Sequence, residues 1–302
     1  MDDIFKDFNL LTAKYKHVDD TSIDVDVLVP KGLPKGEHPI IARFHGGAFT
    51  SGSSLHPAFF PRWVLGLAIN QGAIIVTPNY RLLPESDAPD IMEDLDDLWI
   101  WLKSSLQGLL ATSGSPDCKA DLGRILTVGE SAGGYLSVQF ALDHASEGVR
   151  ACIAECPSLD IRAVAAGGNP DSANQIKKER KAKDNSVKPV ISDPTLSRFH
   201  MINQLVEDGV FLDYFPNIER VHPFDRVRNG WKMPATFMIH GINDTIVPHD
   251  HSVRFAEEVR RQDPSAKVHV ELQPGEHLMD IPLDLDHPWL AKGVKLVTEA
   301  WL

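Results

Sequence analysis

Hydrophobic residues along this chain gather in short runs that alternate with longer amphipathic stretches. The short runs predict buried strands at residues 23–29, 39–45, 72–77, 124–128, 149–155, 235–240 and 267–272. Apolar positions at helical spacing predict helices at residues 60–70, 89–102, 132–144, 252–262 and 290–301. Strands that alternate with helices are typical of βαβ units, so we predict an α/β fold with a mostly parallel central sheet flanked by helices.

One long region interrupts this alternation. Residues 162–233 show no strand pattern; their first half is polar, and their second half carries apolar residues at helical spacing. Such a segment is too long for a plain connection between two elements. We therefore predict a helical cap at residues 162–233, inserted into a core domain formed by residues 1–161 and 234–302.

Length and composition are those of an ordinary globular protein, and the charge disfavours two classes of partner. Of the 302 residues, 43% are hydrophobic and 24% are charged. The chain has 30 Lys and Arg against 42 Asp and Glu, a formal net charge of −12, which disfavours binding to nucleic acid or to an anionic membrane. The densest basic run, residues 177–183, is short, and we interpret it as a solvated segment.

The N-terminus and the cysteines indicate the compartment. The first residues lack the layout of a secretory signal, and no stretch approaches the roughly 20 apolar residues that span a bilayer. The cysteines, an odd number without metal-ligand spacing, are Cys118, Cys152 and Cys156. They fit reduced thiols better than a disulfide framework. We expect a cytoplasmic protein without a metal.

A nucleophile motif stands between a predicted strand and a predicted helix. Residues 129–134 read GESAGG and follow the strand predicted at 124–128. In such a turn the glycines allow strand and helix to approach closely, while the central serine is held on a strained backbone. The bare pattern also occurs in ordinary glycine-rich turns. Its placement here favours Ser131 as a catalytic nucleophile.

A second glycine motif follows the strand predicted at 39–45. His45, Gly46 and Gly47 form an HGG sequence, which suits a loop that exposes backbone amides. Acyl transfer needs preorganised N–H donors for the oxyanion of its tetrahedral intermediate. We predict the amides of Gly46, Gly47 and Ala132 as these donors, with His45 supporting the loop. The alternative is a plain turn after a strand.

An acid and a base follow the nucleophile in the chain. Asp244 comes shortly after the strand predicted at 235–240, and His277 follows the strand predicted at 267–272. Catalytic side chains gather at the carboxyl ends of strands in such sheets. The order Ser131, Asp244, His277 is therefore that of a catalytic triad.

Other residues compete for these roles. The rival histidines are His240, His249, His251 and His269. We interpret His269 as a strand residue, and His249 and His251 as residues at a solvated helix start, since their spacing does not suit a metal site. The rival acids, Asp225 and Asp250, do not directly follow a strand. No cysteine lies in a comparable turn, and no glycine-rich nucleotide-binding motif follows the first strand.

These motifs together resemble the hormone-sensitive-lipase-like branch of the α/β-hydrolases. The resemblance includes HGG at 45–47, YRLLPE at 80–85, the helix predicted at 89–102, GESAGG at 129–134, and the positions of Asp244 and His277. It implies an α/β-hydrolase fold with a helical cap and the activity of a carboxylesterase. The chain departs from the family pattern at Glu130, where Asp or Thr is frequent in microbial members, and in a shortened N-terminal segment.

The expected chemistry is hydrolysis of a small-molecule ester through an acyl-enzyme, without a cofactor. We expect short or medium acyl esters, or an ester of secondary metabolism. Aromatic residues either line the substrate pocket or pack in the core, and these are Phe49, Tyr135, Tyr214 and Phe215.

Several alternatives stay open. The same triad serves lactones, thioesters, amides, carbon–carbon acyl bonds and acyl transfer. A non-catalytic receptor, like the plant gibberellin receptors that resemble this family, is disfavoured because the predicted triad is intact. A purely structural protein would have to carry the triad and the oxyanion loop by coincidence. The oligomeric state is not fixed by the sequence, and a homodimer stays open.

Overall fold

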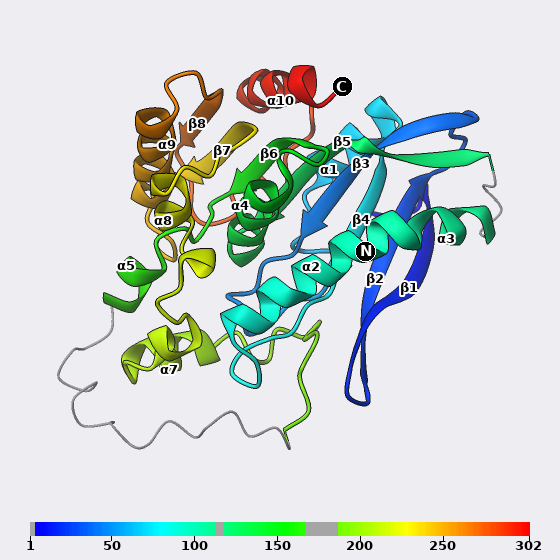
Figure 1. The fold of residues 1–302 in the computed structure, drawn as a ribbon. Coiled ribbons are helices and arrows are strands. Elements are labelled where there is room, and N and C mark those ends of the chain that lie inside the picture. Colours follow the sequence, from blue (N-terminus) through cyan, green and yellow to red (C-terminus); the bar gives the residue numbers. More distant parts are fainter. Residues whose placement is uncertain (1–3, 113–116, 167–186) are drawn as a thin grey trace.

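A twisted sheet of eight strands forms the centre of the computed structural model, which describes residues 4–112, 117–166 and 187–302 (Figure 1). The strands lie in the order β1-β2-β4-β3-β5-β6-β7-β8. Their bounds are β1 Phe8–Val18, β2 Thr21–Pro30, β3 Gly36–Phe44, β4 Ile74–Pro78, β5 Cys118–Glu130, β6 Val149–Glu155, β7 Ala235–Gly241 and β8 Val268–Gln273. The predicted α/β class and all the predicted strands are confirmed.

The sheet is parallel from β4 to β8 and antiparallel at its other end. β1 pairs with β2, and β2 pairs with β4, in antiparallel registers. The sequence pattern does not predict β1, because this edge strand is largely exposed and carries several polar residues. The strand β5 also begins earlier than predicted, since its first residues are partly exposed and lack a continuous apolar run.

Helices cover both faces of the sheet. Their bounds are α1 Arg62–Gln71, α2 Ala88–Ser104, α3 Leu106–Thr112, α4 Ala132–His144, α9 Asp250–Gln262 and α10 Pro288–Trp301. One buried cluster joins α2, α3, α4 and α9 to the sheet, and a second joins α1 and α10 to the opposite face. The predicted helices are confirmed, and the short α3 is an addition.

The YRLLPE segment links α2 to the end of β3. Asp87 and Asp90 cap α2 reciprocally, each side chain accepting a hydrogen bond from the other's backbone N–H. The backbone N–H and the guanidinium of Arg81 both donate to the buried carboxylate of Asp94. The Tyr80 hydroxyl donates to the carbonyl of His45 at 2.7 Å. This motif therefore anchors the loop that follows β3 to the helix layer.

The described part of the region between β6 and β7 contains short helices joined by turns, and one isolated β-bridge between Asp193 and Gly52. Its helices are α5 Ile161–Ala166, α7 Met201–Glu207, η1 Phe211–Tyr214, η2 Glu219–Val221 and α8 Pro223–Arg228. Residues 167–186, with the basic run at 177–183, lie outside the described residues. The division into a core and a cap at 162–233 stays a prediction. Across the described residues, no helix combines the length and apolar character needed to cross a bilayer.

Candidate active site

Ser131 lies in a sharp turn between β5 and α4. Its φ of 56° and ψ of −117° are strained for a residue with a side chain. A Cβ on Gly133 would lie 2.0 Å from the carbonyl oxygen of Phe44, and one on Gly129 would lie 2.1 Å from the carbonyl oxygen of Gly133. Both glycines are therefore required by close backbone approach. The turn has the geometry predicted for a nucleophile elbow.

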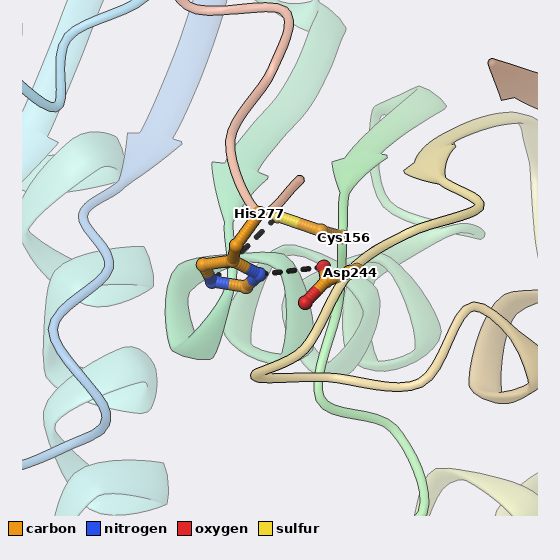
Figure 2. A group of neighbouring side chains, drawn as sticks. All are labelled: Cys156, Asp244 and His277. Atoms are coloured by element: carbon orange, nitrogen blue, oxygen red, sulfur yellow. Dashed lines mark hydrogen bonds and ion pairs between the residues drawn. The ribbon is translucent and has the colours of Figure 1, made fainter. Parts of the chain in front are cut away.

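Asp244 and His277 form a hydrogen-bonded pair near this turn. Nδ1 of His277 lies 2.7 Å from Oδ2 of Asp244 (Figure 2). A carboxylate only accepts hydrogen bonds, so we assign the proton to Nδ1. The other oxygen of Asp244 accepts from the amides of Ile246 and Val247 at 2.9 and 2.8 Å. The carboxylate is thus held by groups on both of its oxygens.

The protonation of Asp244 is set by these partners. Burial opposes its ionisation, but hydrogen bonds from His240 and His277 outweigh burial and hold its pKa well below the ordinary value. Nε2 of His240 lies 3.3 Å from Oδ2 of Asp244. From the sequence we considered His240 only as a rival base. Its spacing of four residues from Asp244, however, places both residues at the end of one strand. In the structure His240 is a direct neighbour of Asp244.

The sheet brings these residues together. Because β5, β7 and β8 are parallel, their carboxyl ends reach one edge, where Ser131, Asp244 and His277 follow them. The two later loops touch directly, since the amide of Asn243 donates to the carbonyl oxygen of Gly275 at 3.0 Å. Within the described parts of the chain, no hydrogen bond joins the Ser131 hydroxyl to His277. Such bonds are frequently long before substrate binds.

The HGG loop differs from the prediction in one respect. The Gly46 N–H donates to Oε1 of Glu130 at 2.9 Å, so this amide is occupied. Gly46 therefore does not present a free donor, because a buried acceptor from the elbow has taken it. Backbone N–H groups without a partner among the described residues do occur nearby, and they belong to Gly47, Ala48 and Ala132. His45 is fully buried, and burial lowers its pKa to about 3, which makes it a neutral supporting residue.

The aromatic residues predicted near the substrate are mostly buried. Phe49, Tyr135 and Phe215 form a cluster with ring centroids 5.2 to 6.1 Å apart. The Tyr135 hydroxyl donates to the carbonyl of Val221 at 2.9 Å. Tyr214 is partly buried and packs against the same core. These contacts favour a packing role at the junction with residues 211–221, and substrate contact stays a prediction.

The rival residues have other partners. His251 accepts a hydrogen bond from the amide of Asp160, and His269 stacks on Phe237. The two rival acids pair with arginines, Asp225 with Arg162 and Asp250 with Arg254. His249 is half-buried at the start of α9. None of these contacts connects a rival residue to Ser131.

Cys156 lies beside the acid–base pair. Its Sγ is 3.9 Å from Nε2 of His277, and it forms with Asp244 and His277 the one cluster of potential metal ligands in the described part of the chain (Figure 2). However, both oxygens of Asp244 are engaged by N–H donors. Burial raises the pKa of the Cys156 thiol well above its ordinary value, so the thiol is neutral. The geometry is that of a hydrogen-bonded His277–Asp244 pair with a neutral thiol beside it.

Comparison with known proteins agrees with the fold. Residues 41–279 match the model of a protein family described by its alpha/beta hydrolase fold. The probable carboxylesterase M8 of Phoma sp. is 31% identical over 98% of both chains. A segment comprising 14% of the non-reducing polyketide synthase stbA of Stachybotrys bisbyi is 26% identical over 91% of this chain. The crystal structure of esterase B from Lactobacillus Rhamnosis shares the fold, with a TM-score of 0.62 and 17% identity, covering 98% of this chain and 85% of that one.

The chain therefore belongs to the α/β-hydrolase family. This confirms the fold and the family that the motifs predict.

Proposed function

We propose that this protein is a serine hydrolase that cleaves a carboxylic ester through an acyl-enzyme. The observation that carries the proposal is the 2.7 Å hydrogen bond between His277 and Asp244, at the sheet edge where Ser131 occupies its strained turn. Asp244 fixes the tautomer of His277 in which Nε2 is free to accept a proton. The similarity to a probable carboxylesterase over nearly the whole chain supports the ester as substrate.

The reaction then proceeds in two steps. His277 accepts the Ser131 proton as the hydroxyl oxygen attacks the ester carbonyl, and the resulting imidazolium protonates the leaving alcohol. Water, activated by the same histidine, hydrolyses the acyl-enzyme and releases the acid. We assign the oxyanion to the unpartnered amides of Gly47, Ala48 and Ala132, with Ala48 in place of Gly46.

The substrate proposed is a small-molecule ester with a short or medium acyl chain, or an ester of secondary metabolism. A panel of p-nitrophenyl esters of increasing chain length measures the acyl preference. The cysteines that the structure describes are buried and free, which supports a cytoplasmic location. A homodimer stays a prediction, which light scattering on the purified protein tests.

Replacement of the nucleophile tests the proposal. Ser131→Ala should abolish hydrolysis of p-nitrophenyl acetate and labelling by a fluorophosphonate. The matched control is Ser158→Ala, because Ser158 is as buried as Ser131 and its amide donates to the carbonyl of Ser131. Labelled peptides from the wild type should contain Ser131. Full turnover in the Ser131→Ala variant, or a label on another serine, contradicts the assignment.

A second candidate is cleavage or transfer of an acyl thioester. The specific observation in its favour is that nearly the whole chain aligns with a segment of a polyketide synthase. The same Ser131, Asp244 and His277 would serve a thioester, since the acyl-enzyme is identical. Steady-state rates with matched oxygen esters and thioesters, and product analysis with a competing alcohol, distinguish the two candidates.

A further inference from the structure

Glu130, the residue before the nucleophile, has a buried carboxylate that the proposed chemistry does not use. Its Oε1 accepts hydrogen bonds from the Arg43 guanidinium at 2.5 Å and from the Gly46 amide at 2.9 Å. The side chains of Glu130 and Arg43 are both fully buried. One carboxylate oxygen therefore connects the elbow with the loop that supplies the neighbouring oxyanion amides.

Arg43 extends this connection along the chain. It donates to the carbonyl oxygens of Ser54 at 2.8 Å and Phe59 at 3.1 Å, and it lies 4.0 Å over the ring of Phe60. The loop that follows the HGG sequence is thus bound to the same charge pair. A buried arginine needs a counter-charge, because a lone cation is costly to bury. Glu130 is the acid that supplies it at hydrogen-bonding distance.

We propose that Glu130 is a positioning residue, whose carboxylate holds the peptide of Gly46 and thereby aims the next amides of the loop at the oxyanion. This inference rests on the proposed function. The peptide between His45 and Gly46 is fixed by this hydrogen bond, and Gly47, the next residue of the loop, has a φ of 117°. Misplacing an oxyanion donor by about 1 Å is enough to lower the rate substantially.

Several charged and titratable groups face Glu130. They are Arg43 on β3, Tyr80 after β4, Glu155 on β6 and Asp280 after β8. Burial raises the pKa of Glu130 to about 7, although Arg43 and the Gly46 amide oppose the rise. Burial and Asp280 raise the pKa of Glu155 well above its ordinary value, so this neighbour is neutral. Of Glu130 and Glu155, which lie side by side on β5 and β6, Glu130 therefore carries the negative charge.

The test replaces each glutamate by its neutral isostere. Glu130→Gln should lower kcat about 10- to 100-fold while KM changes less than about threefold, since an oxyanion donor acts in the transition state. Affinity for a trifluoromethyl ketone analogue of the tetrahedral intermediate should fall by the same factor. In the wild type, the fall of kcat on the acid side of its pH profile should include the protonation of Glu130. In Glu130→Gln this contribution to the pH profile should be absent. The matched control, Glu155→Gln, replaces an acid that is already neutral and should keep kcat.

The outcomes separate this inference from the proposed function. Fluorophosphonate labelling of Ser131 in the wild type supports the nucleophile independently. If that labelling holds while kcat and analogue affinity of Glu130→Gln equal those of Glu155→Gln, the positioning role is wrong. Should Glu130→Gln not fold, Glu130→Asp keeps the charge but withdraws it by one methylene. This variant should lose kcat with little change in KM, and full kcat would overturn the inference.

Discussion

Replacing Asp244 by Asn should nearly abolish turnover, because the structure fixes how the amide must orient. Oδ1 accepts hydrogen bonds from the amides of Ile246 and Val247, and Oδ2 accepts from His277. An asparagine keeps both backbone bonds only by placing its oxygen toward these amides. Its NH₂ group then faces Nδ1 of His277. The histidine must accept there, which moves its proton to Nε2 and removes the base from Ser131.

The magnitude follows from losing the correct tautomer while the other groups remain. Such a loss lowers kcat by about 10³- to 10⁴-fold, or about 4 to 5.5 kcal/mol at 1.36 kcal/mol per tenfold change. The assay is the initial rate of p-nitrophenyl acetate hydrolysis from pH 6 to 10, with KM measured separately. The matched control is Asp250→Asn, since Asp250 is exposed and pairs only with Arg254 among its described salt bridges. An Asp244→Asn variant with kcat within fivefold of the control would refute the reasoning.

Two further predictions concern stability. Gly133→Ala should lower the free energy of unfolding by at least about 2 kcal/mol, or prevent folding, because its Cβ would meet the Phe44 carbonyl at 2.0 Å. Gly108→Ala should raise the free energy of unfolding by about 0.5 to 1 kcal/mol, because Gly108 is an exposed helical residue with open space around it. Urea denaturation measures both, and an undiminished stability of Gly133→Ala would count against the tight elbow. The lowered pKa of Asp244 means that its ionised form stabilises the fold above about pH 4, and that this contribution fades as the pH falls further. The stability difference between wild type and Asp244→Asn should therefore shrink between pH 5 and pH 3, and a difference that grows would contradict the direction of the shift.

Much of the fold is predictable because hydrophobic periodicity is a local property. The parallel strands β3, β4, β6 and β7 are buried along most of their length, and their apolar runs are visible in the chain. The edge strand β1 is not predictable in this way, since its exposed and polar residues resemble those of a loop. The tight turn at Ser131 is predictable for a related reason: the glycines of GESAGG are required by contacts within the turn and with the strand beside it.

The hydrogen-bond partners of individual polar groups are not predictable in the same way. Gly46 and Gly47 are equivalent in the sequence as amide donors, yet Glu130 takes only the first. Glu130 and Arg43 are 87 residues apart, and nothing local indicates that they share a buried bond. The aromatic residues Phe49, Tyr135 and Phe215 fit a pocket or a core equally well until their burial is known.

The sequence by itself determined the α/β fold, the elbow that holds Ser131, and the order of acid and base, because these depend on periodicity and on residues close together in the chain. Only the tertiary structure decided that His277 and Asp244 meet, which amides near Ser131 stay free, and which carboxylate bears the buried charge. Those outcomes depend on groups from separate strands that compete for the same partners through space.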